Sequence, residues 1–277
     1  MIKLSCLVFV LLFQNLLWAQ TQSGKYFDRA IFVLFENTNY QEALQQPFFH
    51  KLAQEGALFT HMMSITHPSQ GNYVALTSGS LDGVQSDKTV DLNVSNVVDL
   101  LEAKGISWKV YAENYPGHCF TGPSRGRYVR KHNPFISYVD LQKNPERCSH
   151  IVNADEFMKD YQNQNLPSYV FYIPNLNDDG HDTDVDYAGQ WYQKTFGSLI
   201  QDQNLMGHTV LISAFDESEK SSLNQIYVSL VSSLIKPGQY GDSLNLYSLL
   251  KLIEDNWGLG SLQRNDTQAP PIPDIWK

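Results

Sequence analysis

Short apolar segments alternate with longer amphipathic segments along most of this 277-residue chain. The short segments are rich in β-branched and aromatic residues, which predicts buried strands. They cover residues 30–35, 107–112, 168–173, 209–215 and 225–231. The longer segments repeat apolar residues at helical spacing and cover residues 96–105, 155–164, 187–200 and 246–258. This alternation predicts an α/β fold with a largely parallel central sheet flanked by helices.

The N-terminal segment has the features of a signal peptide. Lys3 precedes an apolar run over residues 4–13, and Ala19 is a small residue after which a signal peptidase could cut. The run is shorter than the about 20 apolar residues that a membrane-spanning helix needs. We therefore expect residues 1–19 to be removed, residues 20–277 to form a single domain, and the mature protein to be secreted or periplasmic without stable membrane insertion. An uncleaved anchor is the alternative.

The cysteines and the net charge agree with export. Cys6 lies in the predicted signal peptide, so Cys119 and Cys148 remain as an even pair suited to one disulfide. Two free buried thiols are the alternative. Residues 115–145 are rich in Pro, Gly and basic residues, and we expect a long loop or cap stapled to the body within residues 115–150. The formal net charge of −9 argues against a nucleic-acid partner, and the oligomeric state is left open.

Polar side chains follow three of the predicted strands at the point where each strand ends. Glu36 and Asn37 follow the first strand, residues 175–182 follow the third, and Asp216 with Glu217 follows the fourth. In a parallel sheet these points share one edge, where such folds build their sites. Helix caps or solvated turns are the alternative for each cluster. Together, these oxygens suit a divalent cation such as Mg, Ca or Mn, whose identity the spacing does not fix.

A single serine, Ser69, stands between a His-Pro pair and a run that reads as helix from Asn72. It is either a plain helix cap or a nucleophile. A serine hydroxyl needs a base or a metal ion to become reactive, and no G-x-S-x-G motif surrounds Ser69. A metal held by the carboxylates could ionise Ser69, which would attack phosphorus and form a phosphoserine that water later releases.

Four motifs resemble those of a known family. "FENTNY" (35–40), "HPSQGNYVALTSG" (67–79), "PNLNDDGHD" (174–182) and "FDES" (215–218) are similar, in order and spacing, to the secreted phosphoesterase family of acid phosphatases and bacterial phospholipases C. The acid phosphatase branch fits better. The resemblance implies an alkaline phosphatase-like fold and a divalent metal ion bound by Glu36, Asn37, Ser69, Asp216 and Glu217.

The same resemblance implies further roles around the phosphate. Ser69 would be the nucleophile, and His181 with Asp182 would lie beside the phosphate, His181 protonating the leaving group or holding an oxygen. Asn72 would donate to the phosphate, and His67 would orient Ser69. His118 could reach the phosphate from the stapled loop as a substrate contact.

The sequence departs from the family pattern at two positions. Leu246 stands where many members carry a histidine, and Glu217 stands where some relatives have Asp. The remaining histidines lie outside the acidic clusters of the sequence, so we expect surface or core roles for them: His50, His61, His132, His150 and His208. The basic segment 126–135 is expected to be either a solvated loop or a lid that attracts phosphorylated substrates.

These features predict an exported metal-dependent phosphoric monoester hydrolase that acts on a small phosphorylated substrate through a phosphoserine. A phospholipase C or another phosphodiesterase is the first alternative. It would need an apolar groove for its lipid, and no exposed apolar segment of that kind is evident in the sequence. An exported, catalytically inactive protein that keeps the metal site and binds phosphate ligands is the second alternative.

Overall fold

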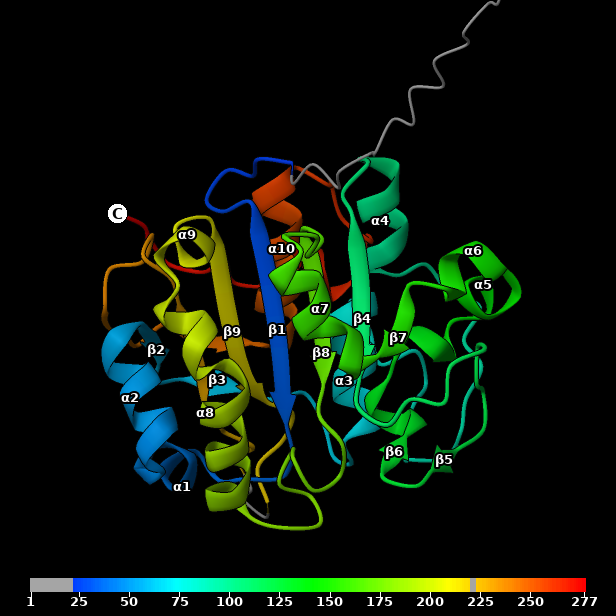
Figure 1. Ribbon diagram of the computed structural model, residues 1–277, viewed down its shortest axis with the longest axis horizontal. Coiled ribbons are helices and arrows are strands. Elements are labelled where there is room, and N and C mark those ends of the chain that lie inside the picture. Colours follow the sequence, from blue (N-terminus) through cyan, green and yellow to red (C-terminus); the bar gives the residue numbers. More distant parts are fainter. Residues whose placement is uncertain (1–21, 220–222) are drawn as a thin grey trace, which may run out of the picture.

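A large central sheet organises the chain (Figure 1). The computed structural model describes residues 22–219 and 223–277, so the predicted signal peptide lies outside the described residues. Within them, the sheet has eight strands. Across the sheet their order is β11 (Gly238–Tyr240), β2 (Ala57–Phe59), β10 (Val228–Val231), β9 (Thr209–Phe215), β1 (Arg29–Phe35), β8 (Tyr169–Ile173), β4 (Trp108–Ala112) and β7 (Ile151–Asn153).

The prediction of a largely parallel sheet is confirmed. Strand β1 pairs in parallel with β8 and β9, and β4 pairs in parallel with β8 and β7. Among the eight described strands of this sheet, only β10 runs antiparallel to its neighbours, β9 and β2. The central strands carry unbroken apolar runs because helices cover both of their faces. All five predicted strands are present, whereas β2, β7 and β11, of three residues each, are too short to show a pattern.

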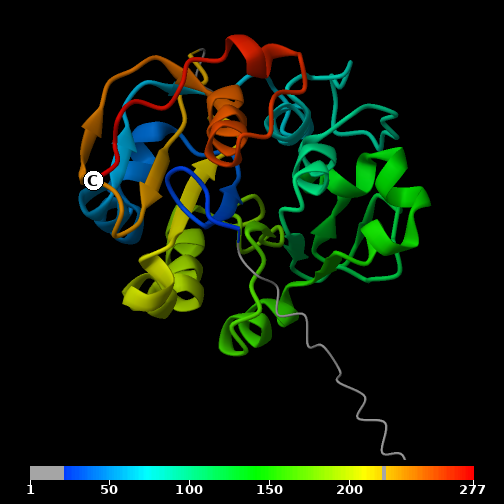
Figure 2. The same ribbon diagram turned by 90° about the horizontal axis from the view of Figure 1, so that it is seen from above.

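Helices pack on both faces of the sheet. The helices of six or more residues are α1 (Tyr40–Gln45), α2 (Pro47–Glu55), α3 (Gln70–Ser78), α4 (Val97–Ala103), α7 (Phe157–Gln162), α8 (Val185–Gln201) and α10 (Leu246–Trp257). The four predicted helices correspond to α4, α7, α8 and α10. Helices α7 and α8 cover one face, and α3, α4 and α10 cover the other (Figures 1 and 2). No described helix is both long and apolar enough to cross a bilayer.

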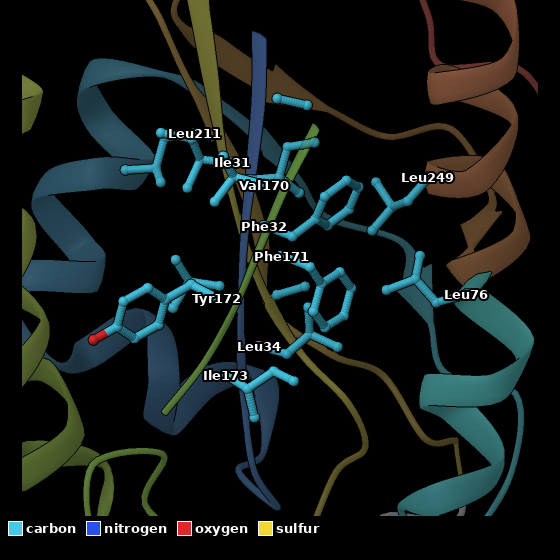
Figure 3. Close-up of a cluster of buried hydrophobic side chains, with 14 of the residues drawn as sticks. Ile31, Phe32, Leu34, Leu76, Val170, Phe171, Tyr172, Ile173, Leu211 and Leu249 are labelled. Carbon is cyan, nitrogen blue, oxygen red and sulfur yellow. The ribbon is translucent and has the colours of Figure 1, made fainter. Parts of the chain in front are cut away.

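Aromatic and aliphatic side chains join each helical layer to the sheet. On one face, the Phe35 ring packs against Phe49 of α2 and Tyr192 of α8, with centroids 4.9 Å away in both cases. On the opposite face, Phe32 and Phe171 point toward helices α3 and α10 (Figure 3). This alternation along β1 follows from the two-residue period of a strand. It holds the helix that follows Ser69 against the carboxyl half of the sheet.

The region 115–150 is stapled as expected, but it is not an unstructured loop. Cys119 and Cys148 form a disulfide with a Cα–Cα distance of 5.8 Å. Between them the chain forms short elements: β5 (Ser124–Arg125), β6 (Tyr128–Val129), η1 (Arg130–His132), η2 (Phe135–Ser137), α5 (Val139–Lys143) and α6 (Pro145–Cys148). Phe135 and Tyr138 are fully buried. The segment is therefore a packed part of the body, and it delivers η1 to the sheet edge.

The disulfide should contribute measurably to stability. It closes a loop of 29 residues, and in the chain-entropy view such a link raises the free energy of unfolding by about 3–4 kcal/mol. We expect Cys119→Ser with Cys148→Ser to lower the denaturant midpoint accordingly. Equal midpoints for the double variant and the oxidised wild type would contradict this expectation.

Candidate active site

The ends of three adjacent strands place the candidate residues together, as their positions in the sequence predict. Glu36 follows β1, Asp216 follows β9, and Asp179 lies in the loop after β8. The backbone N–H of Glu36 donates to the carbonyl of Asp179 at 3.0 Å, and the N–H of Asp216 donates to the carbonyl of Phe35 at 2.9 Å. Asn37 turns with a positive φ of 37°, and its N–H donates to Asp216 Oδ1 at 3.3 Å. Backbone contacts thus fix these side chains at one edge of the sheet.

Ser69 occupies the N-cap position of α3, yet its hydroxyl does not cap the helix. The Oγ atom lies 3.0 Å from Glu36 Oε2 and 3.3 Å from Glu217 Oε1. Because the hydroxyl has a single proton, it donates to only one of these carboxylates at a time. The side chain is 1% exposed, so this contact is a buried one. The structure therefore directs the Ser69 hydroxyl away from its own helix and into the acidic cluster.

The three carboxylates around Ser69 are crowded and buried. Glu36, Asp216 and Glu217 are 1%, 0% and 5% exposed. Burial, together with the negative charges of Glu36 and Glu217, raises the pKa of Asp216 well above its usual range. Burial likewise raises the pKa of Glu217, although His67 opposes it. A cluster of this kind favours a cation.

Two oxygens of the cluster lack a hydrogen bond. Asp216 Oδ2 and Asn37 Oδ1 are buried and accept none within the described part of the chain. Hard oxygen atoms from carboxylates, an amide and a hydroxyl are the donors that Mg, Ca and Mn prefer. In residues 22–219 and 223–277, no three His, Cys, Asp or Glu side chains are arranged to hold a metal ion by themselves. The donor set suits a hard cation in its chemistry, and the carboxylates would have to draw together around it.

A buried histidine that sequence reasoning missed lies in the middle of this cluster. His132 Nε2 contacts Glu36 Oε1, and His132 Nδ1 lies 3.1 Å from Asp179 Oδ2. Its ring stacks on Tyr73 of α3, with centroids 5.1 Å apart. The interpretation of His132 as a residue outside the acidic clusters is wrong. In the sequence, 96 residues separate it from Glu36, and only the packing of η1 against α3 brings the two together.

The positive charge of His132 counteracts the effect of burial on the pKa of Glu36. Burial alone would raise the pKa of Glu36, but the charge and hydrogen bond of His132 outweigh it and hold that pKa at about 2. Burial would lower the pKa of His132, but Glu36 and Asp179 raise it to about 9. The pair is therefore an ion pair at neutral pH. It keeps Glu36 ionised beside Ser69.

His181 and Asp182 lie at the rim of the site. His181 Nδ1 is 2.8 Å from Asp182 Oδ1, and the His181 backbone N–H donates to Asp179 Oδ1 at 2.8 Å. The His181 and His132 rings are 6.2 Å apart. His181 Nε2 lies 3.4 Å from the ammonium of Lys131. Both members of the predicted pair thus sit together, partly exposed, next to the buried cluster.

His67, which the family resemblance implies as the residue that orients Ser69, lies beside Glu217 in the structure. Its Nδ1 lies 2.7 Å from Glu217 Oε2, and its side chain is 44% exposed. Glu217 in turn accepts from the Ser69 hydroxyl. His67 therefore reaches Ser69 through a carboxylate rather than directly.

The Asn72 side chain forms its hydrogen bonds with backbone groups and not with side chains of the site. Its Oδ1 accepts from the N–H groups of Ile65 and Thr66 at 3.1 and 3.0 Å, and its Nδ2 donates to the Thr66 carbonyl at 2.9 Å. The side chain is fully buried. In this structure the amide fixes the strand-to-helix segment that carries Ser69, and it is not free to donate to a phosphate.

His118 and Leu246 lie apart from the chemistry described above. His118 is exposed and lines a hollow with Cys119, Cys148 and Asp155, which none of the acidic cluster residues lines. Leu246, the first residue of α10, is fully buried in the apolar core. The position where many relatives carry a histidine is thus filled here by a packed aliphatic side chain.

Comparison with solved structures defines the class of fold. A protein of the alkaline phosphatase superfamily from Vibrio parahaemolyticus matches 91% of this chain and 72% of its own, with a TM-score of 0.61 and 12% identity. A phosphonate monoester hydrolase of Agrobacterium radiobacter matches 90% of this chain and 78% of its own, with a TM-score of 0.55 and 12% identity. The expected alkaline phosphatase-like fold is confirmed.

Comparison with sequence families identifies the chain more closely. The profile of the Phosphoesterase family matches residues 15–260. This protein belongs to the Phosphoesterase family. It is 35% identical over 260 residues to a Kluyveromyces lactis protein named "Probable acid phosphatase" and 34% identical over 260 residues to an acid phosphatase of Aspergillus fumigatus, covering 89% of this chain in both cases. The chain spans 62% and 58% of the lengths of these two relatives.

A third relative is bacterial. A phosphatidylinositol-3-phosphatase of Mycobacterium tuberculosis is 30% identical over 256 residues, which cover 90% of this chain and 83% of the relative. The family resemblance expected from the four motifs is therefore confirmed.

Removing the His132 side chain should destabilise the fold strongly. His132→Leu leaves Glu36 and Asp179 as uncompensated buried carboxylates, and breaking a buried ion pair costs about 3–5 kcal/mol of unfolding free energy. Chemical denaturation of the purified variant measures this loss. His150→Leu is the matched control, because His150 is partly buried but pairs with a backbone carbonyl and an aromatic ring, both of Trp108, rather than with a carboxylate. Equal losses for the two variants would contradict the pairing.

The Asn72 side chain should act on stability rather than on phosphate affinity. Asn72→Ala leaves the N–H groups of Ile65 and Thr66 without their acceptor, which should cost about 1–3 kcal/mol of unfolding free energy. We expect the inhibition constant of inorganic phosphate to change less than about threefold in the folded variant. A variant with wild-type stability and a phosphate affinity reduced tenfold or more would instead make Asn72 a phosphate donor.

Proposed function

We propose that this protein is an exported, divalent-metal-dependent hydrolase of phosphoric monoesters that acts through a phosphoserine at Ser69. One observation carries the proposal. The Ser69 hydroxyl lies at the start of α3 but forms no capping hydrogen bond to that helix. It contacts two buried carboxylates instead, Glu36 and Glu217. A capping serine would bond to its own helix, whereas a nucleophile needs an activating environment of this kind.

The candidate metal ligands are the hard oxygen donors at the sheet edge: Glu36, Asn37, Ser69, Asp216 and Glu217. Unpartnered buried oxygens on Asp216 and Asn37 support this assignment. A divalent cation bound there would lower the pKa of the serine hydroxyl and offset the charge of the phosphate. Glu217 has a longer side chain than the Asp that the family resemblance gives for some members, and its contacts with Ser69 and His67 support its place in this ligand set.

The side chains of this site divide the reaction between them. Ser69 Oγ attacks phosphorus as its hydroxyl proton passes to Glu217, which it contacts; a new P–O bond forms, and the bond from phosphorus to the ester oxygen breaks. Asp182 holds Nδ1 of His181, so that His181 can deliver a proton from Nε2 to the departing alkoxide. Water then attacks the phosphoserine, His181 accepts a proton from that water, and inorganic phosphate leaves as Glu217 returns its proton to Ser69 Oγ.

The choice of monoesters follows from the relatives. The fungal relatives are named acid phosphatases, and the mycobacterial relative is named a phosphatidylinositol-3-phosphatase. Each of these names describes the removal of a terminal phosphate. A compact polar site with a partly exposed rim suits a terminal phosphate whose alcohol remains outside.

Replacing Ser69 tests the proposal directly. Ser69→Ala removes the nucleophile, so we expect hydrolysis of p-nitrophenyl phosphate to fall at least about 10³-fold, with chelator lowering the wild-type rate as well. The matched control is Ser95→Ala, at an exposed serine. Trapping the wild type in acid during turnover and sequencing phosphopeptides by mass spectrometry should place a phosphate on Ser69.

Other outcomes would replace the proposal. Preferential hydrolysis of bis(p-nitrophenyl) phosphate or of a choline phospholipid would make the protein a phosphodiesterase or phospholipase C. Phosphate binding without turnover of any of these esters, across several added metals, would make it an exported binding protein. Full activity of Ser69→Ala would exclude the phosphoserine.

A further inference from the structure

The turn η1 carries three consecutive basic residues that have three different environments. Arg130 is buried and donates to the carbonyls of Thr121 and Val90 and to the carboxylate of Asp91. His132 is buried against Glu36 and Asp179. The ammonium of Lys131, between them, lies at the rim of the site, where the side chain is 15% exposed. Arg130 and His132 are therefore paired with groups inside the protein, whereas the Lys131 ammonium lies at the edge of the site where substrate would enter.

Two polar contacts hold Lys131 near the start of α3, where Ser69 lies. Its Nζ lies 3.1 Å from Asp87 Oδ2, and Asp87 Oδ1 accepts from the backbone N–H of Gln70 at 3.1 Å. Gln70 directly follows Ser69 in the chain. On its other side the ammonium lies 3.4 Å from His181 Nε2. Asp87 thus ties the ammonium to the first turn of α3, between the nucleophile and the proposed proton donor.

The surroundings keep this ammonium charged. Burial lowers the pKa of Lys131, but the negative charges of Glu36, Asp87 and Asp216 outweigh it and leave the pKa raised. An ammonium has three N–H donors. Asp87 is the anion in direct contact with it, so donors remain for another oxygen ligand. A charged, partly exposed donor beside a site for phosphate is suited to bind a phosphoryl oxygen.

We propose that Lys131 binds a nonbridging oxygen of the substrate phosphoryl group, that Asp87 is its positioning residue, and that this contact favours dianionic monoesters over monoanionic diesters. The inference rests on the proposed function. A monoester has a terminal phosphoryl group with three nonbridging oxygens and up to two negative charges. A diester has two such oxygens and one charge, so it gains less from an added cation.

Variants at Lys131 and Asp87 test this assignment. Lys131→Met keeps the length of the stem and removes the charge, Lys131→Arg keeps the charge, and Asp87→Asn keeps an acceptor for Gln70 while removing the ion pair. Lys88→Met, at an exposed lysine of the same segment, is the matched control. The readouts are kcat/KM for p-nitrophenyl phosphate and its bis-ester, the inhibition constant of inorganic phosphate, and thermal unfolding.

The expected pattern separates binding from folding. Losing one charge-assisted hydrogen bond should reduce kcat/KM for the monoester and phosphate affinity by roughly 10- to 100-fold in Lys131→Met. The bis-ester should lose less than about threefold, Lys131→Arg should recover part of the loss, and Asp87→Asn should show a smaller loss of the same kind. Lys88→Met should match the wild type.

Two results would overturn the assignment. One is a phosphate affinity in Lys131→Met within about twofold of the wild type. The other is an equal loss for monoester and bis-ester together with a lowered melting temperature, which a purely structural tether would produce. If the wild type hydrolyses no ester, the proposed function fails, and phosphate binding measured by calorimetry on the same variants still decides the role of Lys131.

Discussion

The contact between Glu36 and His132 is the interaction on which the rest of the site depends. Glu36 receives the Ser69 hydroxyl through one oxygen and His132 through the other. Without the histidine, a fully buried carboxylate beside Asp216 and Glu217 would favour its protonated form. With it, Glu36 stays ionised and can serve both the hydroxyl and a cation. His132 also reaches Asp179, so the same ring joins the ends of β1 and β8.

Most of the sheet could be predicted from the sequence because its central strands are buried on both faces and appear as unbroken apolar runs. The edge strands β7 and β11 could not, since three residues are too few to show a period. The positions of the carboxylates directly after the strands predicted where they would meet, because the carboxyl ends of parallel strands lie at the same edge of a sheet. Glu36 and Asp216 were therefore predictable, while the partner of Glu36 was not.

The sequence indicates only that the basic segment 126–135 is a solvated loop or a lid, and the separate contacts of His132 and Lys131 could not be predicted for a physical reason. Both residues lie in the disulfide-bridged segment, whose short elements have no regular apolar period, and no local pattern shows which element that segment covers. Only the folded packing of η1 on α3 reveals that the ring of His132 lies on Tyr73. Asn72 is the opposite case, a residue expected to contact substrate that the structure assigns to the backbone. The family resemblance implies that Asn72 donates to the phosphate, but in the structure its side chain bonds to the nearby backbone of Ile65 and Thr66.

The charge of the whole chain is a poor guide to what this site can attract. The protein has a formal net charge of −9, yet a phosphate responds mainly to charges within about a Debye length, roughly 8–10 Å. Within that range η1 supplies a buried imidazolium that balances Glu36 and an ammonium at the rim, held by Asp87. Because these two cations come from adjacent residues of one turn, any shift of η1 would move both the support of the carboxylate and the proposed phosphate contact. The disulfide between Cys119 and Cys148 closes the segment that contains this turn, and it therefore links the packing of the cap to the electrostatics of the site.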